Sequence, residues 1–247
     1  MSKDIKLIAL DMDGTLLNDQ DEISIGNREA IKAAQVLGIH VVLSTGRSLI
    51  TCGDHAKSLA LNSYLVTVNG GEIWDEQGNL LERNSLGSDH VQRMHELSQQ
   101  HNTSFWCVTS DQVYREEFPE NASEHNWIKF GFDTEDDEAR KTILEELRNN
   151  PELEVSNSSL TNIEVNATGV NKARALQRVC KELGITMEHV MAMGDSLNDI
   201  AMITEAGIGV AMGNAQDKVK EIADYVSTTN NEDGVANAIQ RFVLGSK

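Results

Sequence analysis

Short apolar segments rich in β-branched residues alternate with helical patterns at both ends of the chain. Strand-like segments lie at residues 5–10, 39–43, 64–68, 189–193 and 208–211, and helical patterns lie at 30–37, 176–183 and 197–206. Each helical pattern stops at a glycine (Gly38, Gly184 or Gly207), a residue common just after a helix end. Strict alternation of strand and helix predicts an α/β fold, with a Rossmann-like parallel sheet covered by helices on both faces.

The middle of the chain has a different order of elements. Helical patterns at 88–101 and 135–148 are interleaved with strand-like segments at 104–109, 113–115, 127–132, 153–156 and 162–166. This order is typical of a small antiparallel sheet with helices on one face. We therefore predict a discontinuous core made of residues 1–83 and 166–247, with residues 84–165 inserted into it as a second, α+β domain.

The composition is strongly acidic, with 39 Asp and Glu against 21 Lys and Arg and a net charge of −18. Such a surface repels nucleic acid and anionic lipid, so neither is expected as a partner. The three cysteines, Cys52, Cys107 and Cys180, form no C-x-x-C motif, which fits a reducing compartment. No apolar stretch approaches the roughly 20 residues that a membrane span needs. We expect a cytoplasmic protein, and the sequence does not indicate its oligomeric state.

The first predicted strand ends in an acidic turn, Asp11-Met12-Asp13-Gly14-Thr15. Open α/β folds bind their ligands at the carboxyl ends of the strands. Asp11 and Asp13 are two positions apart and leave the strand toward the same side, and Gly14 permits a sharp turn. The alternative is an ordinary solvated turn, because Asp and Gly are common turn residues.

A second acidic segment, Gly194-Asp195-Ser196-Leu197-Asn198-Asp199, follows another predicted strand. Its acids have a structural alternative, since carboxylates in a first helical turn complement the helix dipole. Carboxylates that converge from two strand ends, however, repel one another unless a cation lies among them, and oxygen ligands with open positions suit Mg²⁺. We therefore predict a Mg²⁺ site formed by Asp11, Asp13 and Asp195.

Two further features are suited to binding an anion. Ser44-Thr45-Gly46-Arg47 follows the second strand, where a hydroxyl and free backbone N–H groups can cradle a phosphate, although Ser or Thr there is equally typical of a helix cap. Lys172 opens a predicted helix, an end at which the helix dipole disfavours a cation. Its position is explained if it faces an anion or the carboxylate cluster.

Together these groups have the chemistry of phosphoryl transfer. An aspartate can attack phosphorus to give an aspartyl-phosphate that water later hydrolyses, and Asp11 is the expected nucleophile. Asp13 would protonate the leaving oxygen and then deprotonate the attacking water. Mg²⁺ and Lys172 would neutralise charge on the transferred group.

The set of motifs resembles that of haloacid dehalogenase superfamily hydrolases, specifically the Cof-type sugar phosphatases with a large class IIB cap after the third strand. The resemblance rests on the Asp11–Thr15 motif, Thr45-Gly46-Arg47, Lys172 and the Gly194–Asp199 motif in this order. Asn69-Gly70-Gly71 and residues 209–215 extend it over nearly the whole chain.

The resemblance implies a role for each residue of the motifs. It makes Asp11 the nucleophile and a metal ligand, Asp13 the acid and base that also binds the metal through its backbone carbonyl, and Asp195 the third metal ligand. The phosphoryl group would be bound by Thr45, Gly46, Lys172, Asn198 and the Met12 backbone. Asp199 would orient Lys172 or a metal-bound water. One departure is Ala173, where relatives commonly have glycine after the lysine.

We therefore expect a Mg²⁺-dependent phosphatase of small phosphorylated metabolites, with sugar phosphates as the favoured class. A phosphomutase is the second enzyme class, because it uses the same aspartyl-phosphate but keeps water out. The non-enzyme alternative is a catalytically silent binding or regulatory protein on the same fold. Every acid that the chemistry needs is present, which favours an active enzyme.

Specificity is expected to lie in the cap. It holds seven of the eleven aromatic residues, most of them expected in its small core and one or two in the substrate pocket: Phe105, Trp106, Tyr114, Phe118, Trp127, Phe130 and Phe132. Residues 111–154 contain fourteen acids and five Lys and Arg, which is −9 of the total charge. An acidic cap predicts substrates whose non-phosphate part is neutral or cationic.

Overall fold

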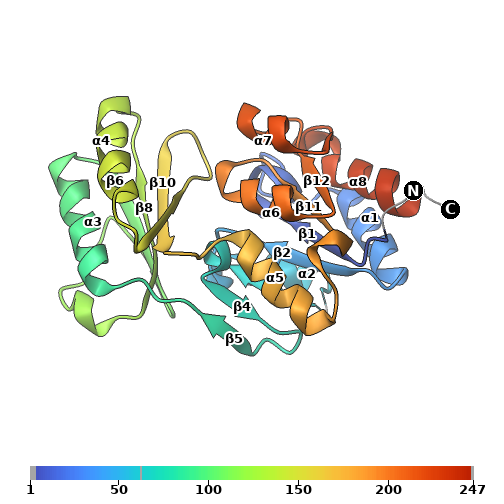
Figure 1. The fold of residues 1–247 in the computed structure, drawn as a ribbon, viewed down its shortest axis with the longest axis horizontal. Helices are drawn as coiled ribbons and strands as arrows, with labels where there is room; N and C mark the ends of the chain where they lie inside the picture. Colours follow the sequence, from blue (N-terminus) through green and yellow to red (C-terminus); the bar gives the residue numbers. More distant parts are fainter. Residues whose placement is uncertain (1–3, 62, 246–247) are drawn as a thin grey trace.

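A computed structural model of the protein describes residues 4–61 and 63–245. In this part of the chain, two sheets lie next to each other along the long axis of the molecule (Figure 1). The larger sheet has the strand order β13-β12-β11-β1-β2-β3-β4-β5. Its strands are β1 (Leu7–Leu10), β2 (His40–Ser44), β3 (Leu65–Thr67), β4 (Glu72–Trp74), β5 (Leu80–Arg83), β11 (Val190–Gly194), β12 (Ile208–Ala211) and β13 (Tyr225–Val226).

Helices cover both faces of the larger sheet. They are α1 (Ile25–Val36), α2 (Leu49–Ser58), α5 (Lys172–Leu183), α6 (Ile200–Glu205), α7 (Asp217–Ile222) and α8 (Gly234–Ile239). Helix α1 packs on α8, and α5 packs on α6 (Figure 1). All four residues of β1 are buried, as a strand covered on both faces requires. We call this sheet with its helices the core, and it confirms the predicted α/β fold.

The larger sheet is not parallel throughout. Pairing is parallel from β13 to β3, but β4 and β5 add to the edge as antiparallel strands. Asn69 and Gly70 after β3 have φ values of 60° and 95°. This left-handed backbone turns the chain straight back into a hairpin, so no helix crosses over at this point.

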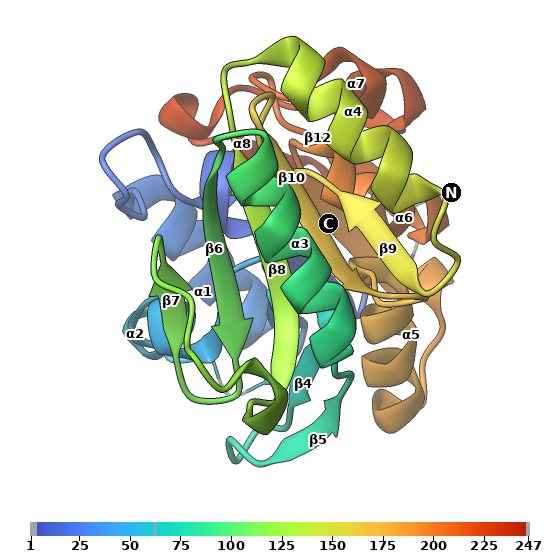
Figure 2. The ribbon, with the colours of Figure 1, turned by 90° about the vertical axis from the view of Figure 1, so that its left-hand side faces the viewer.

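The smaller sheet is antiparallel, in the order β7-β6-β8-β10-β9. Its strands are β6 (Ser104–Thr109), β7 (Val113–Arg115), β8 (Trp127–Asp133), β9 (Leu153–Ser156) and β10 (Asn162–Ala167). Helices α3 (Ser88–Gln100) and α4 (Asp137–Arg148) lie together on one face, as predicted (Figure 2). We call this sheet with its two helices the cap. The predicted boundary at residue 165 falls inside β10, and the division into core and cap domains remains our proposal.

The two faces of the cap sheet differ in chemistry. Apolar side chains between the sheet and its helices form one buried cluster that includes Phe105, Trp127, Phe130 and Phe132. The other face is turned toward the core, where Val108 and Ile128 of the cap pack with Val68 of the core, and Trp106 and Val113 lie against them. None of the described helices is long and apolar enough to cross a membrane. Cys52, Cys107 and Cys180 are free and buried.

Candidate active site

The acidic motifs meet because their strands are neighbours in the core sheet. β1 lies between β2 and β11, with Leu10 opposite both Leu43 and Met193, so the carboxyl ends of the three strands are level. Asp11 directly follows β1, and its backbone N–H donates to the Met193 carbonyl at 3.0 Å. Thr45 follows β2 and Asp195 follows β11, as the sequence predicts.

Lys172 forms the buried centre of the site. Its Nζ donates to Asp11 Oδ1 and to Asp199 Oδ1, both at 2.6 Å, and its side chain has no exposed surface. Burial alone would lower the pKa of this amine, but the two carboxylates override that effect and raise it above its usual range. The side chain is therefore a permanent cation held against Asp11 by Asp199, as the sequence predicts for a lysine in this position.

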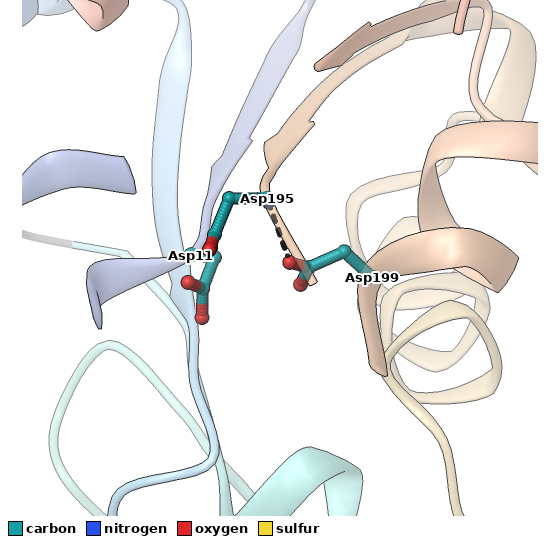
Figure 3. Close-up of side chains that lie close together, drawn as sticks. All are labelled: Asp11, Asp195 and Asp199. Atoms are coloured by element: carbon teal, nitrogen blue, oxygen red, sulfur yellow. Dashed lines mark hydrogen bonds between the residues drawn. The ribbon is translucent and has the colours of Figure 1, made fainter. Parts of the chain in front are cut away.

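Asp11, Asp195 and Asp199 form a compact acidic cluster in which one oxygen of each lies within 4.8 Å of the others (Figure 3). Asp199 is fully engaged, because its Oδ2 accepts from the backbone N–H groups of Asp195 and Ser196 at 2.9 and 3.0 Å. These bonds replace the first turn of the predicted helix 197–206 with a separate turn at Leu197–Asp199, so that α6 begins at Ile200.

The remaining two carboxylates fit a hard cation. Thr15 Oγ1 and Ser196 Oγ donate to the two oxygens of Asp195 at 3.2 and 2.9 Å. Burial, and then the charge of Asp199, raises the pKa of Asp195 to about 7. A Cβ at residue 14 would lie 2.6 Å from Asp195 Oδ2, so the space beside this carboxylate needs Gly14. The carboxylates of Asp11 and Asp195 repel each other unless a cation lies between them, and oxygen ligands of this kind suit Mg²⁺.

The Asp13 side chain lies outside this cluster. Arg47 binds it through two nitrogens, with Nε 3.0 Å from Oδ2 and Nη2 2.5 Å from Oδ1, and Arg47 also binds Asp21 Oδ1 at 2.6 Å. The Asp13 carboxylate therefore does not join Asp11 and Asp195, and only its backbone could serve as a metal ligand in this arrangement. The structure thus pairs Arg47 with the predicted catalytic acid, a contact that the sequence did not predict.

Of the residues predicted to bind phosphate, some line the cavity beside Asp11 and others are buried behind it. Gly46 and Asn198 line the cavity next to Asp11, and the Asn198 Nδ2 donates to Asn69 Oδ1 at 3.2 Å. Thr45 is buried, and its Oγ1 accepts from the Arg47 backbone N–H at 3.1 Å. The Met12 side chain belongs to the core cluster, which leaves its backbone for a ligand. Ala173 is buried in the same cluster, so the departure at this position lies on the packed side of α5.

A cavity of about 430 Å³ lies between the acidic motifs and the core-facing side of the cap. The core contributes Asp11, Asp13, Gly46, Arg47, Ser48, Thr51, Asp195, Ser196 and Asn198, and the cap and its loops contribute Trp106, Val108, Val113, Arg115, Lys129, Ser158, Asn162 and Glu164. Its size is that of a small-molecule site. Trp106 is the aromatic side chain of the cap that lines this cavity.

A buried ion pair joins the cap to the core at the cavity. Lys129 Nζ lies 2.7 Å from Glu164 Oε1 and donates to the Gly46 carbonyl at 3.2 Å. Glu164 Oε2 accepts from Asn69 Nδ2 at 2.7 Å, and Asn69 in turn binds Asn198. Burial would raise the pKa of Glu164, but Lys129 and the hydrogen bonds lower it overall. The sequence analysis did not predict this ion pair, although Lys129 within an apolar strand indicates a buried lysine that needs a partner.

Replacing Glu164 with glutamine should destabilise the protein by about 3–5 kcal/mol, because Lys129 would stay buried without its counter-charge. Urea unfolding measures the change. The pKa of Glu164 is lowered on folding, so its stabilisation is complete above its ordinary pKa of 4.5 and is lost as the pH falls below that value. The double variant Lys129→Met with Glu164→Leu is the control and should recover most of the stability. An equal loss in both variants would contradict the role of the ion pair.

The convergence of Asp11, Lys172 and Asp195 at one sheet edge, under a cap, is the arrangement of an enzyme of phosphoryl transfer. A family model of haloacid dehalogenase-like hydrolases matches residues 8–131 and 116–239. The chain belongs to this family.

Individual relatives agree in function and in fold. The chain is 64% identical over 241 residues to 5-amino-6-(5-phospho-D-ribitylamino)uracil phosphatase YcsE of Bacillus subtilis, a match that covers 98% of this chain and 97% of that protein. A haloacid dehalogenase-like hydrolase from B. subtilis has a TM-score of 0.89 at 27% identity, covering 97% of this chain and all of the other. The subclass IIB sugar phosphatase BT4131 has a TM-score of 0.82 at 25% identity, covering 96% and 98%.

These findings confirm the predicted family and enzyme class. The chain is a Cof-type phosphatase that acts on small phosphorylated metabolites. The alternatives of a phosphomutase and of a silent binding protein gain no support from them. Phosphatases of this family typically use Mg²⁺ and an aspartyl-phosphate.

Proposed function

We propose that this phosphatase hydrolyses 5-amino-6-(5-phospho-D-ribitylamino)uracil, with Asp11 as the nucleophile. The observation that carries the proposal is the buried contact between Lys172 and Asp11 at one wall of a cavity that the cap completes. The substrate is supported by the relative of that activity, which is 64% identical along almost the whole chain.

The chain's own residues can supply both halves of the reaction. An Asp11 oxygen attacks phosphorus, the bond from phosphorus to the ribityl oxygen breaks, and Asp13 donates a proton to that oxygen. Water then attacks phosphorus, Asp13 takes a proton from it, and the bond to Asp11 breaks to release inorganic phosphate. Arg47 must release at least one Asp13 oxygen before that oxygen can carry a proton to the substrate, because both oxygens accept hydrogen bonds from the guanidinium in the structure.

Lys172 and the strand-end backbone hold the transferred group. The ammonium faces Asp11 and can neutralise a phosphoryl oxygen. Gly46 and Asn198 line the same cavity, and Thr45 and the Met12 backbone would complete the phosphate site. Asp11 and Asp195, with the backbone of Asp13, would hold Mg²⁺, which supplies positive charge to the phosphoryl oxygens. Asp199 acts on Lys172 and on the loop of Asp195, and so positions both.

The rest of the cavity suits a neutral polyol attached to a ring. Each ribityl hydroxyl both donates and accepts hydrogen bonds, and the cavity offers donors and acceptors on Ser158, Asn162 and the Lys129–Glu164 pair. The non-phosphate part of the proposed substrate is uncharged, in keeping with the expectation drawn from the acidic cap. The sequence predicted sugar phosphates as the substrate class, and the proposed substrate is one particular polyol phosphate, a ribityl phosphate that carries a pyrimidine.

The test is phosphate release from a panel of monoesters with Mg²⁺ present. The panel holds the proposed substrate, D-ribitol 5-phosphate, glucose 6-phosphate and phosphoglycolate. We expect the proposed substrate to have the highest kcat/KM, and we expect free phosphate without isomerised sugar phosphate. A higher kcat/KM for another member would overturn the substrate, and isomerisation without phosphate release would overturn hydrolysis in favour of a mutase.

Removal of divalent cations should reduce turnover by at least about 100-fold, because the Asp195 carboxylate would then face the phosphate with no cation between them. A chelator titration followed by addition of Mg²⁺ measures the loss and its recovery. Asp195→Asn should raise the Mg²⁺ concentration needed for half-maximal rate. The exposed Asp54→Asn serves as the matched control, since Asp54 lies on α2 and its ion-pair partner among the described residues is Lys57. Full activity after exhaustive chelation would contradict the site.

A further inference from the structure

Trp106 has an unusual place in the cap. It lies in β6, opposite Gly131 of β8 on one side and Arg115 of β7 on the other. A Cβ on Gly131 would lie 2.2 Å from the Cε2 and Cζ2 atoms of the indole, so the ring lies directly over the backbone of β8. The absence of a side chain at residue 131 gives the ring a flat support.

The ring is not part of the aromatic core of the cap. Phe105, Trp127, Phe130 and Phe132 pack between the sheet and α3 and α4, whereas Trp106 is on the opposite face and lines the cavity of the acidic motifs. A partly exposed aromatic face in a polar cavity is a platform on which a flat ligand can stack.

Two cations flank the platform. Lys129 Nζ lies 6.0 Å from the centre of the indole, and its other contacts are Glu164 and Gly46. Arg115 is exposed at the cavity, and in residues 4–61 and 63–245 its guanidinium has no ion-pair partner. A free guanidinium beside a stacking platform can donate to the carbonyl oxygens of a ring held there.

We propose that Trp106 is the specificity-determining residue for the substrate's heteroaromatic ring, which stacks on the indole while Arg115 donates to its carbonyl oxygens. This inference rests on the proposed function, since it concerns the ring that distinguishes that substrate from a simple polyol phosphate. The phosphate is held by the core, and the ribityl chain spans the Lys129–Glu164 pair between the two ends.

The experiment compares two substrates that differ only in the ring system. Wild type, Trp106→Leu and Trp106→Phe are assayed on 5-amino-6-(5-phospho-D-ribitylamino)uracil and on D-ribitol 5-phosphate. Trp106→Leu should lower kcat/KM for the first substrate by about 10- to 100-fold, the range of base–aromatic stacking, with KM taking most of the change. Its kcat/KM for D-ribitol 5-phosphate should stay within about twofold of wild type. Trp106→Phe should recover part of the loss.

The variant Gly131→Ala tests the position of the indole independently, because the added methyl group displaces the ring from the β8 backbone while Trp106 itself is kept. We expect the same selective loss for the ring substrate, with thermal melting verifying that both variants are folded. An equal loss on both substrates would overturn the inference and assign Trp106 to packing. If wild type fails on the ring substrate yet releases phosphate from other monoesters, the proposed substrate fails and the inference falls with it.

Discussion

Asp11→Asn should abolish phosphate release, with a fall in kcat of at least about 10⁴-fold. The amide cannot form the acyl-phosphate bond, and no other carboxylate in the described residues lies both against Lys172 and beside Asp195 except Asp199, which is held by two backbone N–H groups. Steady-state phosphate release under saturating substrate measures the loss.

The same substitution should leave the fold intact. The amide has nearly the same shape as the carboxylate, and Lys172 keeps its ion pair with Asp199, so we expect the variant to fold. Thermal melting of Asp11→Asn beside the exposed control Asp54→Asn tests this. Turnover by a folded Asp11→Asn protein at more than a trace of the wild-type rate would contradict the assignment of Asp11 as nucleophile.

Lys172→Met should reduce both activity and stability. Loss of the ammonium removes the positive charge that faces the phosphoryl group, and we expect kcat to fall by at least about 100-fold. Asp11 and Asp199 would then be buried without their shared cation, which should destabilise the folded protein by about 3–5 kcal/mol. Phosphate release and urea unfolding in the presence of a chelator measure the two effects.

A second variant separates these roles of Lys172. Adding Asp199→Asn to Lys172→Met removes one of the two stranded carboxylates, so part of the stability should return while activity stays low. If activity returned together with stability, Lys172 would be a structural residue alone, and its proposed role at the phosphoryl group would be wrong.

The fold could be predicted where apolar pattern and local geometry agree. The segments of β1, β2 and β12 are short apolar runs bounded by clear ends, and the order of elements in the middle predicted the cap sheet and its two helices. The hairpin of β4 and β5 was missed because β4 has only three residues and Glu72 within it is polar. Its reversal depends on the left-handed backbone at Asn69, which no pattern of apolar positions records.

The core half of the site could also be predicted, because the motifs of Asp11, Thr45 and Asp195 each directly follow a strand of the parallel part of one sheet and must reach the same edge. The cap half could not. Lys129 reaches Gly46 across 83 positions and Glu164 reaches Asn69 across 95, and these contacts depend on how the cap docks. The pairing of β8 with β6 shifts in register between Lys129, opposite Val108, and Trp127, opposite Thr109. Strict alternation along β8 therefore does not predict that Trp127 packs under the helices while Lys129 lines the cavity.

The central claim is that phosphate passes through Asp11. Its most direct measurement is a rapid acid quench of wild-type protein mixed with Mg²⁺ and 5-amino-6-(5-phospho-D-ribitylamino)uracil, followed by mass spectrometry of the peptides. We predict a phosphoryl group on Asp11 that appears before free phosphate and decays at the rate of turnover. A phosphoryl group on a different side chain, or phosphate release at the full rate with Asp11 unmodified at every quench time, would contradict the account.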